Sequence, residues 1–101
     1  MRTAQIIYNP AAGRFPVAMA IPSAEHALRD AGWEVSSAST RSGEDGTYLA
    51  KKAAEKGIDA VFAVGGDGTI GQVASGLIGT KTALGILPAG TANVWGKELG
   101  M

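Results

Sequence analysis

Three glycines, one carboxylate and one hydroxyl stand together at Gly65–Thr69, directly after the apolar run Ala60–Val64. The run predicts a buried strand, and the segment from Ile70 onward predicts a helix. Ligands of open α/β sheets bind at the carboxyl ends of strands, where glycine allows close approach and a helix N-terminus offers N–H groups to an anion. The segment therefore predicts a site for a phosphate-bearing ligand. Asp67 would repel phosphate unless a metal ion or a reacting proton lies between them.

The chain must position these residues with alternating strands and helices. We expect strands at 4–8, 33–37, 59–64 and 83–87, and helices at about 17–31, 42–57, 70–78 and 91–99. Pro22 is expected to interrupt the first helix, and Ser23 to cap a new one. The third and fourth strands contain continuous apolar runs, which predicts that both are central. The pattern is that of an α/β fold with three layers, in which helices cover both faces of a parallel sheet of about four strands.

Loops that follow parallel strands lie at one edge of the sheet, so residues 9–13, Thr40, 65–69 and 88–93 are expected to meet there. They offer backbone N–H groups, hydroxyls, amides and the Asp67 carboxylate, a mixture that can hold a nucleotide and its magnesium ion. Any one of these loops is more often an ordinary turn or a helix cap than a ligand site. The nucleotide hypothesis depends on their convergence.

Two other phosphate motifs are disfavoured. Gly66-x-Gly68-x-x-Gly71 matches the dinucleotide fingerprint, but residues 87–89 lack the acidic residue expected about 20 positions on. Lys81 follows Gly79 and Thr80 without the spacing of a phosphate-loop lysine.

Composition narrows the class of protein. The 101 residues suffice for one compact domain, and nine basic residues balance nine acidic ones, which gives no electrostatic case for a nucleic-acid partner. The chain has no cysteine, so disulfides and thiolate metal sites are excluded. No apolar stretch resembles a signal peptide or a membrane span, and a cytoplasmic protein is expected.

Four blocks of sequence resemble the catalytic domain of the diacylglycerol kinase family, which includes bacterial lipid kinases and sphingosine kinases and is related to NAD kinases. They are Asn9-Pro10-Ala11-Ala12-Gly13, Thr40 with Gly43, Gly65-Gly66-Asp67-Gly68-Thr69, and the stretch from Gly85 to Asn93. Their order and spacing match over nearly the whole chain, so residues 1–101 look like the N-terminal nucleotide-binding domain of such a kinase.

The resemblance implies phosphoryl transfer from ATP to a lipid hydroxyl with Mg²⁺, in which Asp67 is the candidate catalytic residue and metal ligand. It implies a nucleotide site formed by Asn9, Pro10, Ala11, Ala12, Gly13, Thr40, Gly65, Gly66, Asp67, Gly68, Thr69, Gly71, Thr91 and Asn93. Where the family usually carries Asn-Glu or His-Glu, this chain has Gly71-Gln72, which puts a metal contact or a loop-fixing hydrogen bond in doubt.

Family members also have a second, β-rich domain that carries the usual catalytic base and much of the lipid site. We expect the present chain to be a fragment or a short gene product without that domain, with little kinase activity alone and with membrane contact only in the intact enzyme. Two alternatives stay open. One is a kinase that phosphorylates NAD, and the other is a non-catalytic domain remnant that associates with itself through exposed apolar surface.

Overall fold

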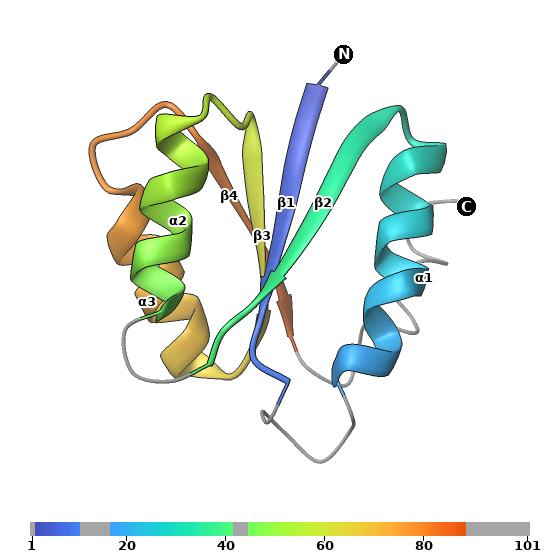
Figure 1. Ribbon diagram of the computed structural model, residues 1–101, viewed down its shortest axis with the longest axis horizontal. Helices are drawn as coiled ribbons and strands as arrows, with labels where there is room; N and C mark the ends of the chain where they lie inside the picture. The colour runs from blue at the N-terminus through green and yellow to red at the C-terminus, as the bar shows by residue number, and fades with distance from the viewer. Residues whose placement is uncertain (1, 11–16, 42–44, 89–101) are drawn as a thin grey trace.

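The computed structural model describes residues 2–10, 17–41 and 45–88. They form four strands, β1 (Arg2–Tyr8), β2 (Trp33–Ser39), β3 (Ala60–Gly65) and β4 (Ala83–Pro88), and three helices, α1 (Val17–Asp30), α2 (Asp45–Glu55) and α3 (Asp67–Leu77). The strands are all parallel and lie in the order β2-β1-β3-β4. Helix α1 covers one face of the sheet, whereas α2 and α3 cover the other (Figure 1). The three-layer α/β/α prediction is confirmed.

Alternation along β1 and β3 divides the core in two. Ile6 and Val64 point toward α1 and meet Ile21 and Leu28, which are seven positions apart on one face of that helix. Ile7 and Val61 point the opposite way, toward α2 and α3. The same two strands thus supply the centre of both clusters, as expected for strands that are buried on both faces.

The fourth strand lies at an edge of this sheet, so the prediction that it is central is wrong for the described residues. Leu84 and Ile86 remain 37% and 50% exposed, although their strand is as apolar as β3. An apolar run is typical of a buried strand, but it does not determine whether a neighbouring strand pairs on one side or on both. The opposite face of β4 is packed more closely, because a Cβ on Gly85 would lie 2.4 Å from the ring of Phe62.

Pro22 does not interrupt the first helix, contrary to the prediction, and Ser23 lies within the helix rather than capping it. A proline inside a helix costs about 3 kcal/mol, because it removes one backbone hydrogen bond and crowds the preceding turn. Burial of Ile21 and Leu28 on the core side contributes about 1.5–3 kcal/mol for each side chain, which offsets that cost. Pro22 itself lies on the exposed side of the helix.

The ends of α1 and α2 agree with the predicted glycine stops. Gly32 and Gly57 adopt φ values of +95° and +80°, a region that disfavours side chains. No helix of the described part is both long and apolar enough to cross a membrane.

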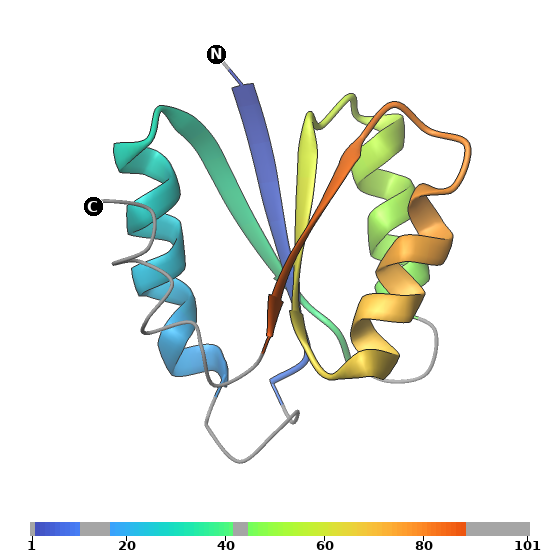
Figure 2. The same ribbon diagram turned by 180° about the vertical axis from the view of Figure 1, so that it is seen from behind.

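Helices α2 and α3 approach each other so closely that glycine is required at their contact. A Cβ on Gly76 would lie 2.5 Å from the carbonyl oxygen of Thr47 and 2.7 Å from the Cβ of Ala50. The two helices therefore form one layer, seen side by side in Figures 1 and 2.

We expect Gly76→Ala to lower the free energy of unfolding by about 1–3 kcal/mol, because the added methyl group must push α2 away from α3. Ser75→Ala is the matched control, since Ser75 is exposed on the same helix. Urea unfolding followed by circular dichroism measures both variants. Equal stability of Gly76→Ala and the parent chain would contradict the close contact.

Asp59 joins β1 to β3 at the amino end of the sheet. Its carboxylate accepts hydrogen bonds from the backbone N–H of Thr3 at 2.7 Å and from the Thr3 hydroxyl at 3.1 Å. These two bonds, the backbone one foremost, hold the pKa of Asp59 below its ordinary value of 3.8.

A carboxylate whose pKa is lowered by folding stabilises the fold above its ordinary pKa, and the contribution disappears as the pH falls through the lowered value. We expect Asp59→Asn to be less stable than the parent chain near neutral pH. The two stabilities should converge as the pH falls from about 5 to about 2. Thermal unfolding across this range measures the difference, and a constant gap between the two proteins would rule out the proposed role of the Asp59 charge.

Candidate functional site

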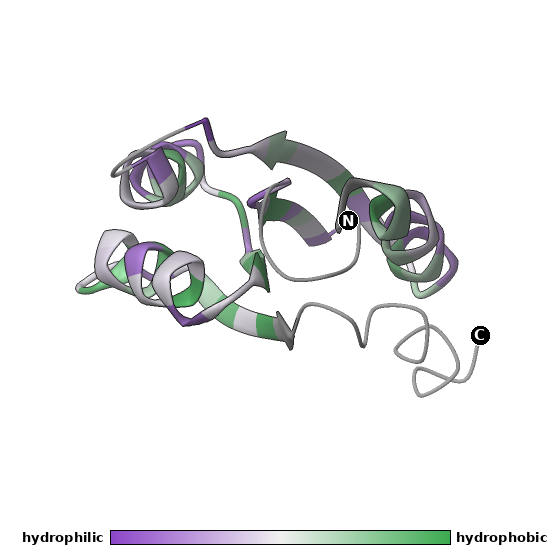
Figure 3. Ribbon diagram, turned by 90° about the horizontal axis from the view of Figure 1, so that it is seen from below, coloured by the Kyte–Doolittle hydropathy of each residue, from purple (hydrophilic) through white to green (hydrophobic). Residues whose placement is uncertain are grey.

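The chain leaves neighbouring strands β1 and β3 toward opposite faces of the sheet. After β1 it enters α1 on one face, and after β3 it enters α3 on the other. The carboxyl ends of β1 and β3 therefore define the topological switch point, where open α/β sheets bind ligands. Figure 3 looks at the molecule from below, with the sheet between α1 and the α2–α3 layer.

Backbone hydrogen bonds hold three of the predicted loops at this edge. The N–H of Asn9 donates to the carbonyl oxygen of Val64 at 3.3 Å, and the N–H of Thr40 donates to that of Tyr8 at 2.8 Å. Asn9 thus lies beside the end of β3, and Thr40 lies beside the end of β1. The structure brings together the beginnings of the loops after β1, β2 and β3, as their spacing in the sequence predicts.

Helix α3 begins at Asp67, three residues earlier than expected, so Asp67, Gly68 and Thr69 form its first turn instead of a loop. Glycine and aspartate favour turns in isolation, but the bond from the N–H of Ile70 to the carbonyl oxygen of Gly66, 3.1 Å, closes a helical turn here. Gly66 occupies the N-cap position with no side-chain hydrogen bond. The first N–H groups of α3 therefore have no side-chain cap, which leaves the positive end of the helix dipole suited to an anion.

Gly65 is required by the fold itself. Its φ is +153°, and a Cβ on it would lie 3.0 Å from the Oγ1 atom of Thr69. Thr69 is only 7% exposed, and its side chain lies against Gly65. The side chain of Thr69 therefore packs at the turn between β3 and α3.

Gly66, Gly68 and Gly71 are exposed and have a different character. None has a positive φ, and a Cβ on any of them would have no atom within 4 Å in the described structure. A glycine inside a helix costs about 1 kcal/mol relative to alanine, so α3 carries two unfavourable residues that its described packing does not require. Their effect is to leave backbone uncovered at the start of the helix, where a ligand can approach closely.

Asp67 lies exposed on the first turn of α3, at the same edge of the sheet. Among residues 2–10, 17–41 and 45–88, no group of three or more His, Cys, Asp or Glu side chains could hold a metal ion. Mg²⁺ is usually held by one or two carboxylates together with substrate phosphates, so a single exposed carboxylate beside a phosphate site fits that ion.

The structure adds little about the remaining predicted site residues. Pro10 is exposed directly after Asn9. Ala11, Ala12, Gly13, Thr91 and Asn93 lie outside the described residues.

Gln72 has a structural role that the sequence did not reveal. Its side-chain Oε1 atom accepts a hydrogen bond from the N–H of Gly46, in the first turn of α2, at 3.1 Å. In the sequence, Gln72 stands out only as a departure from the family motif, which put a metal contact or a loop-fixing hydrogen bond in doubt. Gln72 is bonded to the first turn of α2, and only the packing of α2 against α3 identifies this partner.

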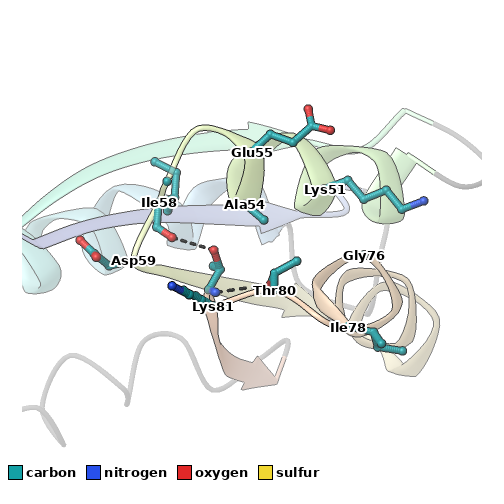
Figure 4. Close-up of a pocket in the computed structure, with 11 residues that line it drawn as sticks. Lys51, Ala54, Glu55, Ile58, Asp59, Gly76, Ile78, Thr80 and Lys81 are labelled. Carbon is teal, nitrogen blue, oxygen red and sulfur yellow. Dashed lines mark hydrogen bonds between the residues drawn. The ribbon is translucent and has the colours of Figure 1, made fainter.

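A hollow of about 610 Å³ lies at the opposite edge of the sheet, among Ile58, Ile78, Thr80, Thr82 and neighbouring residues. Figure 4 shows Lys51 and Glu55 pointing outward from it. The hydroxyls of Thr80 and Thr82 already donate to the carbonyl oxygens of Leu77 and Ile58, at 2.7 and 2.8 Å. Asp59, which also lines the hollow, is already bonded to Thr3, and the predicted site residues lie elsewhere.

The chain is similar to known proteins along its whole length. Residues 3–101 match the model of the diacylglycerol kinase catalytic domain. The chain is 38% identical over 103 residues to a diacylglycerol kinase of Bacillus subtilis, with 100% of this chain and 34% of that protein covered. It is 37% identical over 100 residues to a diacylglycerol kinase of Staphylococcus epidermidis, with 97% and 32% covered.

The fold is also similar to a crystal structure of a diacylglycerol kinase from Bacillus anthracis. The TM-score is 0.76 at 27% identity, and the match covers 89% of this chain and 34% of that one. The chain thus spans about one third of the length of these relatives. The blocks that carry the resemblance, the parallel α/β sheet and the matched family model agree, and the chain belongs to the diacylglycerol kinase catalytic domain family.

Proposed function

We propose that this chain is the ATP-binding part of an enzyme that transfers the γ-phosphate of ATP to the hydroxyl of a diacylglycerol-like lipid. The observation that carries the proposal is the start of α3, where a helix N-terminus without a side-chain cap meets exposed glycines at the switch point of the sheet. Membership of a kinase family supports the reaction class, and the names of the relatives support the lipid acceptor.

In this proposal the backbone N–H groups of Gly66 to Thr69 donate to the phosphate oxygens of ATP. The bare surface at Gly68 and Gly71 lets the phosphates approach the helix without a steric clash. The loop that begins at Asn9 and the residue Thr40 complete the site from the neighbouring strands, because both are hydrogen-bonded to the ends of β3 and β1. Thr91 and Asn93 enter the proposal through the family motif alone.

Asp67 would hold Mg²⁺ together with the phosphates, since it is the predicted site's exposed carboxylate on the first turn of α3. The ion would supply charge neutralisation for the transferring phosphoryl group. The contribution of the chain itself is positioning, because the loops that contact the nucleotide are fixed to a rigid parallel sheet.

Binding and phosphorylation of the lipid are proposed only for a protein as long as these relatives, which are about three times as long as this chain. The 101 residues alone are proposed to bind nucleotide with little phosphoryl transfer. ATP binding cannot distinguish the lipid kinase from the NAD kinase alternative, because both would use the same ATP site. Phosphorylation assays with diacylglycerol and with NAD as acceptors distinguish them.

Self-association is the remaining alternative. Ile78, Leu84 and Ile86 are exposed apolar residues that could support it. Sedimentation velocity of the 101-residue chain decides the matter, since a monomer at micromolar concentration would exclude a stable assembly.

We expect the 101-residue chain to bind ATP more tightly in Mg²⁺ than in EDTA, and Asp67→Asn to lose most of that difference. The reason is that the amide cannot neutralise the ion as the carboxylate does. Calorimetric titration with ATP measures the affinities, and Glu34→Gln, a change at an exposed position on β2, is the control. The same Mg²⁺ dependence in Asp67→Asn and the parent would remove Asp67 from the metal site, and no heat from the parent would contradict the ATP site itself.

Gly68 and Gly71 are expected to lower the stability of α3 and to favour nucleotide binding. We expect Gly68→Ala and Gly71→Ala each to raise the free energy of unfolding by about 0.5–1 kcal/mol, because alanine is the better helix former and its methyl group enters open space.

The same substitutions should weaken ATP binding about tenfold or more, and Gly68→Val further, because a side chain would occupy the space of a phosphate. Ser75→Ala, near the other end of α3, should leave the affinity unchanged. Parent-like affinity in Gly68→Val would show that the exposed backbone does not contact the nucleotide.

A further inference from the structure

The first turn of α2 is fixed to α3 by steric and polar contacts. A Cβ on Gly46 would lie 2.8 Å from the Oε1 atom of Gln72, so a side chain there would displace that oxygen. The N–H of Gly46 donates to Oε1 at 3.1 Å. One residue farther along α2, the hydroxyl of Thr47 donates to the backbone carbonyl of Gln72 at 2.9 Å. Gln72 therefore contacts α2 through two different oxygens.

The first turn of α2 is in turn connected to the loop that follows β2. The carboxylate of Asp45, the first residue of α2, accepts a hydrogen bond from the N–H of Arg41 at 2.8 Å. Arg41 directly follows Thr40, whose own N–H is bonded to Tyr8 at the end of β1. A short chain of contacts thus runs from Thr40 through Asp45 and Gly46 to Gln72.

At its other end this chain of contacts reaches the proposed phosphate site. Gln72 follows Gly71 directly and lies in the second turn of α3, while Asp67 and Gly68 lie in the first. The side chain of Gln72 is half-buried, and its Oε1 atom is bonded to the first turn of α2. Gln72 therefore links the start of α2 to the helix that carries the proposed phosphate-binding turn.

We propose that Gln72 is a positioning residue for nucleotide binding: its side-chain oxygen fixes the start of α2, and with it Thr40, relative to the phosphate-binding turn of α3. The inference rests on the proposed ATP site. What the position requires is an acceptor oxygen at the end of a side chain of this length. A carboxylate would meet that requirement as well as the amide does, whereas an apolar side chain of similar size would not.

The test compares Gln72→Met, which keeps the length and removes the acceptor, with Gln72→Glu, which keeps the acceptor. Thr47→Val is the matched control, because it removes the other hydrogen bond between α2 and α3 and leaves the Gln72 side chain intact. The 101-residue chain is used throughout. Calorimetric titration with ATP and Mg²⁺ measures affinity, and amide hydrogen exchange measures the protection of Gly46.

We expect Gln72→Met to expose the Gly46 amide to exchange and to weaken ATP binding about threefold to tenfold, the range of one lost hydrogen bond. Gln72→Glu should retain both properties, and Thr47→Val should lower the melting temperature without changing the affinity. If Gln72→Met does not fold, Gln72→Ala at a temperature where circular dichroism shows it folded replaces it.

Three results would overturn the inference. ATP affinity in Gln72→Met equal to that of the parent would exclude a positioning role and leave the ATP site standing. Equal weakening in Thr47→Val and Gln72→Met would reduce Gln72 to general packing between the helices. Absence of ATP binding by the parent would remove the proposed function and this inference together.

Discussion

β1 and β3 pair in parallel over five residues, from Ala4 opposite Ala60 to Tyr8 opposite Val64, and this pairing determines what the rest of the structure can do. It places two strands side by side whose following helices lie on opposite faces of the sheet. The ends of the two strands are joined by the hydrogen bond from Asn9 to Val64. The loops after β1 and β3 therefore begin next to each other, although more than fifty residues separate them in the chain.

The glycines around α3 differ in their roles, and the described structure distinguishes them. Gly65 and Gly76 are needed by the fold, since a Cβ on either would meet atoms at 3.0 Å or less. Gly68 and Gly71 have open space around them and ordinary backbone angles, so in the described structure they only weaken the helix that contains them. Residues that lower stability without a packing reason are characteristic of functional surfaces, which is why the start of α3 is the strongest evidence for a site.

The α2–α3 layer connects that surface to the loop after β2. Its contacts are close enough to exclude a side chain at Gly76, and the side-chain oxygen of Gln72 accepts a hydrogen bond from the first turn of α2. Tightly packed elements move together rather than deform, so the position of Thr40 and that of the first turn of α3 are coupled. A site that works mainly by positioning, as phosphoryl transfer does, depends on such couplings.

The sequence by itself determined the α/β class, most element boundaries and the grouping of Asn9, Thr40 and Gly65–Thr69 at one edge, because these follow from local periodicity and from the shared direction of parallel strands. It mispredicted Pro22 as a helix break and the 83–87 strand as central, and it placed the start of α3 three residues late. Those errors have one cause. Whether a proline is tolerated, which side of a strand is paired and where a helix begins depend on contacts with residues distant in the chain. The tertiary structure alone decided that Gly65 is closely packed whereas Gly68 has open space around it, and that Gln72 is bonded to Gly46. The reason is that steric exclusion and hydrogen-bond partners exist only once the helices and strands have packed.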